Sequence, residues 1–193
     1  MSEAIARRDY NRTQGALRLA ALYVFVGFLL WLSAPTPRSV YAGLPFLVVG
    51  EAIRFWAAGH LRKTVELITS GPYRYTRNPL YLGRLLIFVG LCLICSLPLA
   101  ANWVVMLAGL AVFFGYYLPR KERVEPARLR QQHGAAYERY AQAVPALLPT
   151  LRPYAEGAST GWSSERMLRN REHWMVIGLT LIWLLQLWRA SKV

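Results

Sequence analysis

One stretch limits the possible folds of this chain more than any other: residues 85–118 contain no charged side chain. As a single α-helix, rising about 1.5 Å per residue, this stretch would be about 50 Å long, whereas the hydrocarbon core of a bilayer is about 30 Å thick. We therefore expect the chain to fold back within it. Pro98 interrupts a helix and Asn102 is polar, so the turn is predicted at residues 96–102, between two membrane spans.

Further apolar runs indicate a polytopic membrane protein. The chain has 193 residues, 55% of them hydrophobic, and several runs are long enough to cross a bilayer. We predict an all-α fold with a single membrane domain over residues 1–193. Its polar segment, residues 120–172, is predicted to be cytoplasmic and to contain a helix near 122–142 that caps the third and fourth spans. About five spans are predicted, near residues 16–33, 39–59, 79–96, 100–118 and 173–189.

The distribution of charge predicts the orientation in the membrane. The formal net charge is +13, which could indicate a nucleic-acid partner, but the basic residues lie in the gaps between apolar runs, as membrane topology requires. Most of them fall at the N-terminus, in the loop of residues 60–79 and in the polar segment, which are therefore predicted to be cytoplasmic. The basic start of the chain lacks a small-residue cleavage site, so the first span is predicted to be retained. We expect membrane lipids, not nucleic acid, as partners.

Two pairs of residues inside the apolar runs have competing explanations. Cys92 and Cys95 are the only cysteines, and no second pair or nearby histidine completes a metal site. We interpret them as small apolar residues on one helix and predict no metal site. Glu51 and Arg54 are three residues apart on one helix face. They either form a pair that locks helix packing or mark a functional site, since ionisable groups at membrane depth are costly.

The block of residues 70–84 is the densest group of turn formers, aromatic rings and cations in the chain. Its Gly-Pro and Asn-Pro dipeptides mark two turns, and Pro79 suits the first turn of a helix. We predict a shaped loop that leads into a membrane helix. A basic and aromatic belt at the membrane interface would explain the charges and rings, but not the paired turns.

This block and a second one resemble a known family. Residues 71–83 read Gly-Pro-Tyr-Arg-Tyr-Thr-Arg-Asn-Pro-Leu-Tyr-Leu-Gly. The run is similar to the Gly-Pro-Tyr-Arg-x-x-Arg-His-Pro-x-Tyr-x-Gly signature of the membrane methyltransferases that include isoprenylcysteine carboxyl methyltransferase and the phospholipid N-methyltransferases. In residues 125–149, Glu-Pro-Ala-Arg-Leu, His-Gly-Ala-Ala-Tyr-Glu-Arg-Tyr and Val-Pro followed by Leu-Pro resemble the second conserved run of that family. The resemblance covers about residues 50–150, including Arg54 and Trp56.

Three departures from the family pattern stand out. Asn78 occupies a position where the family often has His, as in bacterial-like members, and Asn also donates and accepts hydrogen bonds. Pro126 replaces the second Glu of a pair and leaves Glu125 alone. His133 replaces an aromatic residue and is interpreted as structural. The resemblance to bacterial-like members implies a prokaryotic cytoplasmic membrane, and the charge distribution predicts that the site faces the cytoplasm.

The resemblance implies S-adenosyl-L-methionine as the cofactor, and the residue types agree with it. Such a donor needs an anion, a forked cation and aromatic partners. The predicted cofactor-binding residues are Tyr73, Arg77, Asn78, Pro79, Tyr81, Gly83 and Glu125. The candidate catalytic residues are Arg77 and Glu125, with Arg54 and Arg74 expected to orient an anionic acceptor.

The predicted function is methyl transfer to a lipid-like or lipid-anchored acceptor, such as an isoprenylcysteine-type carboxylate or a phospholipid amine. Two alternatives remain open: a nicotinamide-dependent membrane reductase of related fold, and a non-catalytic protein that binds anionic lipids. Binding of S-adenosylhomocysteine or of NADPH distinguishes the three. The acceptor itself, the role of the last span and the oligomeric state do not follow from the sequence.

Overall fold

The computed structural model describes the whole chain except residues 1–16, 18–19, 22–23, 63–66, 159 and 193. The described part is helical and contains no strand, as predicted. The longer helices are α2 (Pro37–His60), α3 (Pro79–Ile94), α4 (Ala101–Val112), α5 (Leu118–His133), α6 (Ala135–Ala143), α7 (Ser164–Arg169) and α8 (Glu172–Ala190). Short 3-10 turns cover Gly71–Arg74 and Pro98–Ala100, and a π-helical segment covers Phe113–Tyr117.

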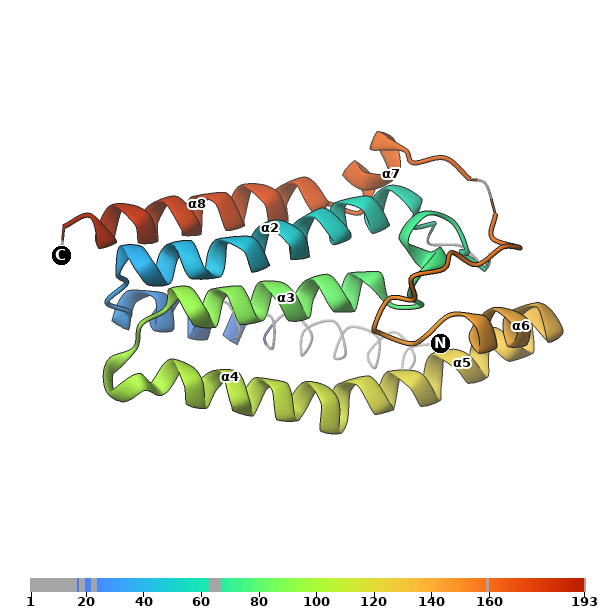
Figure 1. The fold of residues 1–193 in the computed structure, drawn as a ribbon, viewed down its shortest axis with the longest axis horizontal. Helices are drawn as coiled ribbons and strands as arrows, with labels where there is room; N and C mark the ends of the chain where they lie inside the picture. The colour runs from blue at the N-terminus through green and yellow to red at the C-terminus, as the bar shows by residue number, and fades with distance from the viewer. Residues whose placement is uncertain (1–16, 18–19, 22–23, 63–66, 159, 193) are drawn as a thin grey trace, which may run out of the picture.

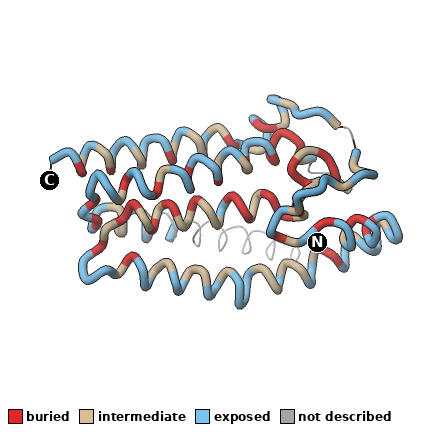
Figure 2. The backbone as a smooth tube through the Cα atoms, in the orientation of Figure 1, coloured by how far each residue is buried: buried red, intermediate tan, exposed pale blue. Residues whose placement is uncertain are grey.

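The helices form an elongated bundle in which α8, α2, α3 and α4 run side by side (Figure 1). At one end of the bundle lie α5, α6, α7 and the loops between them; the chain ends at the other. Buried residues follow α3 and the inward side of α2 (Figure 2). On α4 the buried residue is Asn102 alone, and large apolar side chains such as Trp103, Val104 and Leu107 are exposed. An apolar exposed face of this kind suits contact with lipid.

Two pairs of glycines allow α2 and α3 to pack closely. A Cβ atom on Gly83 would lie 2.5 Å from the backbone oxygen of Gly50, and one on Gly90 would lie 2.9 Å from that of Gly43. The two glycines of each helix are seven residues apart. Small residues at such a spacing are a common device for close approach of helices in membranes, where the hydrophobic effect does not drive helix association.

The ends of α2 and α3 follow from local sequence. Thr36 and Ser39 form a reciprocal capping box at the start of α2, with Pro37 in its first turn. Asn78 precedes α3 and Pro79 begins it, as the sequence predicted. A proline fits there because the first helical N–H has no partner within the helix.

The uncharged stretch folds back where the sequence predicted it. Helix α3 ends at Ile94, and the turn of Pro98–Ala100 contains two residues with positive φ, Leu99 at 55° and Ala100 at 56°. The side chain of Asn102 donates a hydrogen bond to the backbone oxygen of Cys92 across this turn, at 3.3 Å. The polar residue that predicted the turn therefore joins its two sides.

The second half of the hairpin differs from the prediction. One continuous helix runs from Ala101 to His133 through α4, the π-helical segment and α5, instead of a span that ends near 118 and a separate helix over 122–142. Pro119 does not end this helix. A proline removes one N–H, and its ring crowds the carbonyl four residues before it. That carbonyl belongs to the π-helical segment Phe113–Tyr117. The break comes at Gly134, whose φ of 51° favours glycine, and α6 begins after it.

Length and hydropathy identify two candidate membrane spans among the described residues, α2 and the helix Pro98–His133; α3 is apolar but shorter. The five-span topology and the cytoplasmic cap therefore remain predictions. Part of the first predicted span lies outside the described residues, while residues 24–32 are helical. Both cysteines are buried and free, and no group of three or more potential metal ligands occurs in the described part of the chain.

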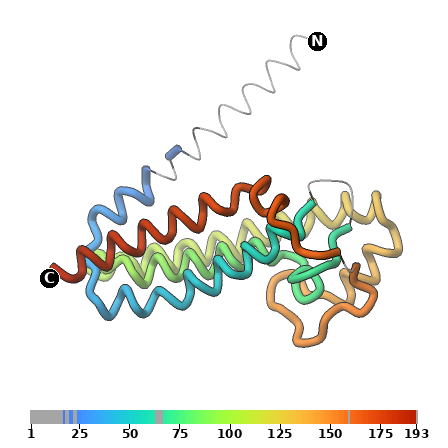
Figure 3. The backbone as a smooth tube through the Cα atoms, turned by 90° about the horizontal axis from the view of Figure 1, so that it is seen from above, coloured from blue at the N-terminus to red at the C-terminus, as the bar shows by residue number. Residues whose placement is uncertain are grey.

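The C-terminal helix is tied to the bundle at both of its ends. In the last turn of α8, the guanidinium of Arg189 donates hydrogen bonds to the backbone oxygens of Leu30, Trp31 and Ser33. These contacts satisfy carbonyls at the end of helix 24–32, which leaves the bundle beside the end of α8 (Figure 3). At the other end, Asn170 donates to the backbone oxygens at the end of α2. Helix α8 is thus part of the fold rather than an appendage.

Candidate functional site

The loop between α2 and α3 is held in shape by the end of α2. Gly71 has a φ of 57°, and a Cβ atom at this position would collide with the ring of His60. The same ring is hydrogen-bonded to the hydroxyl of Ser70 at 3.0 Å. A glycine is required here both for its backbone conformation and for the space. The first of the two predicted turns therefore packs directly on the helix that precedes it.

The segment after α6 pins the same loop through its backbone. The amide of Arg77 donates to the oxygen of Pro145 at 2.9 Å, and the hydroxyl of Thr76 donates to the oxygen of Leu147 at 2.9 Å. Tyr140 closes the other side, where its hydroxyl donates to the backbone oxygen of Tyr73 at 2.7 Å. The two sequence blocks that carry the family resemblance are thus in direct contact.

A cavity of about 510 Å³ lies between this loop, the end of α2 and the helices α5 and α6. Four of the predicted cofactor-binding residues line it: Tyr73, Arg77, Asn78 and Glu125. Its volume is within the range of small-molecule sites, roughly 300–1,000 Å³. The other described residues of its lining are Leu61, Arg62, Leu67, Ile68, Glu122, Pro126, Arg128, Leu129, Gln132, Tyr137 and Tyr140.

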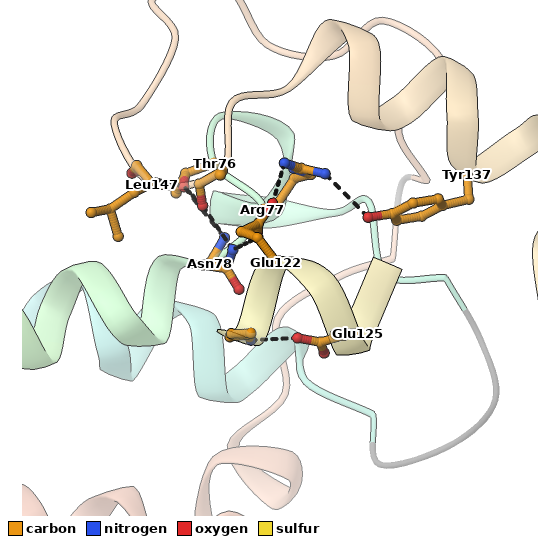
Figure 4. A network of polar contacts seen from close by, with 9 residues as sticks. Thr76, Arg77, Asn78, Glu122, Glu125, Tyr137 and Leu147 are labelled. Atoms are coloured by element: carbon orange, nitrogen blue, oxygen red, sulfur yellow. Dashed lines mark hydrogen bonds and ion pairs between the residues drawn. The ribbon is translucent and has the colours of Figure 1, made fainter. Parts of the chain in front are cut away.

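A polar network organises one wall of the cavity (Figure 4). The guanidinium of Arg77 donates to Glu122 at 2.5 Å and to the hydroxyl of Tyr137 at 3.1 Å. The side-chain amide of Asn78 donates to the other carboxylate oxygen of Glu122 at 2.9 Å and to the backbone oxygen of Ala146 at 2.8 Å. Glu122 therefore fixes two neighbouring loop residues at once, and the wall is rigid and largely charge-neutral.

One polar atom of this network has no hydrogen-bond partner among the described residues: the Nε of Arg77 is buried and unpaired. A buried donor without a partner is costly and is a common feature of binding sites. Burial raises the pKa of the hydroxyls of Tyr73 and Tyr140 above their usual value, so these two rings stay neutral over an even wider pH range. The cavity thus combines a free cationic donor, neutral rings and the carboxylate of Glu125.

Glu125 lies on α5, one turn after Glu122, and is already paired. Its carboxylate lies 2.6 Å from the ammonium of Lys121, one turn earlier on α5. That ammonium also lies over the ring of Tyr81, 3.9 Å from the centroid. Tyr81 in turn contacts the ring of Tyr117 at 5.4 Å. Tyr81 therefore lies near the cavity, but it is not one of the described residues that line it.

Five predicted site residues lie outside the described lining of the cavity. Pro79 is buried at the start of α3, and Gly83 serves the packing of α3 on α2. Arg74 donates from its Nε to the backbone oxygen of Tyr154 at 3.0 Å and so holds the segment after α6. Tyr81 is linked to the cavity residue Glu125 by the ammonium of Lys121. The fifth is Arg54.

Arg54 is buried between α2 and α8, with 4% of its surface exposed. Its guanidinium lies 2.5 Å from Glu172 and 3.7 Å from Glu51. The predicted pair with Glu51 is therefore present, but the closer carboxylate is one that the sequence did not indicate. This geometry favours the packing explanation of the pair, and a role of Arg54 in orienting an acceptor stays a prediction.

Sequence reasoning missed the residue that connects the site, Glu122. The signal that could have found it is its spacing: Glu122 and Glu125 lie three residues apart, so one helix presents both carboxylates on adjacent positions of one face. The rings of Tyr137 and Tyr140 were quoted as part of the second block but were not assigned to the site.

Comparison with known proteins adds a family match over part of the chain. Residues 42–125 match the family described as phospholipid methyltransferase. This stretch contains most of α2, the loop between α2 and α3, the hairpin of α3 and α4, and Glu122. The match confirms the predicted resemblance to the membrane methyltransferases of the isoprenylcysteine carboxyl methyltransferase and phospholipid methyltransferase family.

Individual proteins are also similar to this chain. The chain is 36% identical over 121 residues to a probable protein-S-isoprenylcysteine O-methyltransferase of Oryza sativa subsp. indica, covering 56% of this chain and 60% of that protein. It is 33% identical over 123 residues to the nickel-cobalt-cadmium resistance protein NccN of Alcaligenes xylosoxydans xylosoxydans, covering 63% of this chain and 53% of that protein. The chain thus spans between half and two thirds of the length of these relatives. No solved structure matches it.

Proposed function

We propose that the protein is an integral membrane methyltransferase that uses S-adenosyl-L-methionine and acts on a lipid-like or lipid-anchored acceptor. The observation that carries the proposal is the cavity itself. Both blocks of the family resemblance build it, and Arg77, Asn78 and Glu125 face it from two different elements. Pocket residues that come from separated motifs are stronger support than either motif alone, since fold likeness by itself does not define function.

The residues present fit this donor. Its α-carboxylate needs a cationic hydrogen-bond donor, which the unpaired Nε of Arg77 offers. Its ammonium or sulfonium needs an anion, which Glu125 supplies from α5. Its adenine ring needs apolar and aromatic surface, which Tyr73, Leu67 and Leu129 supply. When bound, the donor supplies a methyl group activated by the positive charge on sulfur.

The contribution of the protein is then positioning and exclusion of water. Glu122 holds the loop residues Arg77 and Asn78 in fixed orientation, and this preorganises the side of the cavity that would grip the donor. The cavity lies at the end of the apolar helices, so an acceptor with a lipid-like tail reaches it from the bilayer. Burial of the reacting groups removes the water that would otherwise screen them.

The chemistry of the acceptor decides what else is required. A carboxylate accepts a methyl group without a base, whereas an ammonium acceptor must first lose a proton. The earlier expectation that Arg54 and Arg74 orient a carboxylate belongs to the first case. From the distribution of basic residues, we propose a site that faces the cytoplasm of a prokaryotic cytoplasmic membrane.

Titration calorimetry on the purified protein in nanodiscs tests the proposal. We expect S-adenosylhomocysteine to bind and NADPH not to bind. Arg77→Ala should weaken binding of S-adenosylhomocysteine, and Glu125→Gln should weaken binding of S-adenosyl-L-methionine, each about tenfold or more, as expected for loss of a charged contact of roughly 1.5–3 kcal/mol. Arg130→Ala, an exposed residue of the same helix α5, is the matched control and should leave binding unchanged.

The alternative outcomes are distinct. Binding of NADPH alone would point to a reductase, and binding of neither compound would favour a protein that contacts anionic lipids without catalysis. Unchanged affinity in both Arg77→Ala and Glu125→Gln would show that the donor does not occupy this cavity.

A further inference from the structure

The ammonium of Lys121 fills a position that is built to hold a cation. It lies 3.9 Å from the centroid of the Tyr81 ring and 2.6 Å from the carboxylate of Glu125. An aromatic face combined with a carboxylate is a typical environment for ammonium and other organic cations. The side chain of Lys121 is 17% exposed, less than the 43% of Glu125. The lysine is thus the more buried member of the pair, which is unusual for a residue that normally extends into water.

The position of this ammonium relates Tyr81 to the cavity. Tyr117, Lys121 and Glu125 recur every four residues and so lie along one face of the continuous helix. Tyr81 contacts the first two, and the third lines the cavity. The ammonium therefore lies between the ring and the carboxylate at the edge of the cavity. Arg84, whose guanidinium carbon is 5.4 Å from the ring centroid, is exposed and does not bridge to Glu125 through any contact described.

We propose that Lys121 is an internal substitute for the sulfonium of the methyl donor. This inference rests on the proposed function. When the charged donor binds, its sulfonium takes the place of the ammonium against Tyr81 and Glu125, and Lys121 moves aside. After methyl transfer the sulfur is a neutral thioether, which the ring and the carboxylate attract far less. The return of Lys121 to its original position then favours release of the product.

The proposal predicts different changes in affinity for charged and neutral ligands of the same shape. Because Lys121 competes with a sulfonium but not with a thioether, its removal should strengthen binding of S-adenosyl-L-methionine selectively. A cation–aromatic contact of about 1 kcal/mol corresponds to roughly a fivefold change in affinity. We expect Lys121→Met to lower the Kd of S-adenosyl-L-methionine by about fivefold or more, and that of S-adenosylhomocysteine by less than about twofold.

Calorimetry of both compounds on the full-length protein in nanodiscs measures this difference. Lys121→Arg keeps the competing charge and should resemble the wild-type protein. The matched control is Lys192→Met, because Lys192 also lies 3.9 Å over an aromatic ring, that of Trp188, at the far end of α8. It should change neither affinity. Lys121→Gln serves for the same comparison if Lys121→Met does not fold, as judged by its thermal unfolding.

Two results would overturn the inference. Equal gains for both compounds would place the amino-acid ammonium, rather than the sulfonium, at this position, and no gain for either would show that Lys121 does not compete. Both results leave the proposed function intact, since the wild-type protein still binds. If the wild-type protein bound neither compound, the proposed function would fail first, and the role of Lys121 with it.

Discussion

The buried contact between α2 and α8 gives the sharpest test of what holds this bundle together. The side chains of Arg54 and Glu172 are 5% and 6% exposed and lie 2.5 Å apart, while Glu51 is a second carboxylate 3.7 Å from the same guanidinium. Removing one member of a buried ion pair costs roughly 3–5 kcal/mol, because the other charge stays buried without compensation. The stability cost of a substitution therefore depends on which of the three residues is replaced.

Arg54→Met should be the most damaging single change. It leaves two carboxylates facing each other without a cation, so we expect a loss of about 4 kcal/mol or more in the free energy of unfolding. Glu172→Gln leaves Arg54 with Glu51 as a remaining partner and should cost less, about 1–3 kcal/mol. Replacing all three with apolar residues of similar size should restore much of the stability, since a buried ion pair is seldom better than good apolar packing.

Denaturant titration of the variants in mixed micelles, followed by tryptophan fluorescence, measures these differences. S-adenosylhomocysteine affinity is determined on the same samples as a second readout. A larger cost for Glu172→Gln than for Arg54→Met would refute the argument from the charge balance. A stable Arg54→Met protein with altered acceptor use would instead support the role of Arg54 in orienting the acceptor.

Two further changes probe packing and hydrogen bonding. Gly83→Ala should lower stability by about 1–3 kcal/mol because its Cβ atom would lie 2.5 Å from a backbone oxygen of α2. The control Gly115→Ala has open space around it and should be neutral or slightly stabilising. Thermal unfolding compares the two variants, and equal effects would contradict the close helix contact. Tyr140→Phe leaves the buried backbone oxygen of Tyr73 without the hydroxyl that lies 2.7 Å from it, and should cost about 1–3 kcal/mol in denaturant titration. A neutral Tyr140→Phe would show that another group satisfies this oxygen.

The local features of the fold were legible in the sequence because they depend on short-range physics. An uncharged stretch longer than a bilayer must turn, and Pro98 and Asn102 marked the place. Pro79 began a helix because its fixed φ and missing N–H suit that position. The pairing of the two motif blocks was also predictable, since each consists of residue types with special backbone or recognition properties.

Other features depended on which elements come together, and the sequence alone did not determine them. The fourth span was predicted to end near residue 118, but one helix passes through Pro119, after a π-helical segment, and continues to the glycine at position 134. Arg54 has a nearby carboxylate three residues away, yet its shortest contact is to Glu172, more than one hundred residues along the chain.

The site also combines residues that the sequence predicted with contacts that only the tertiary structure shows. The sequence indicated Tyr73, Arg77, Asn78 and Glu125, because charge, ring and amide types report what a residue is able to bind. Only the tertiary structure decided that Glu122 holds the network, and that Lys121 lies between Glu125 and Tyr81. The reason is physical: the type of a side chain fixes its possible partners, but the packing of distant helices decides which of those partners lies within reach.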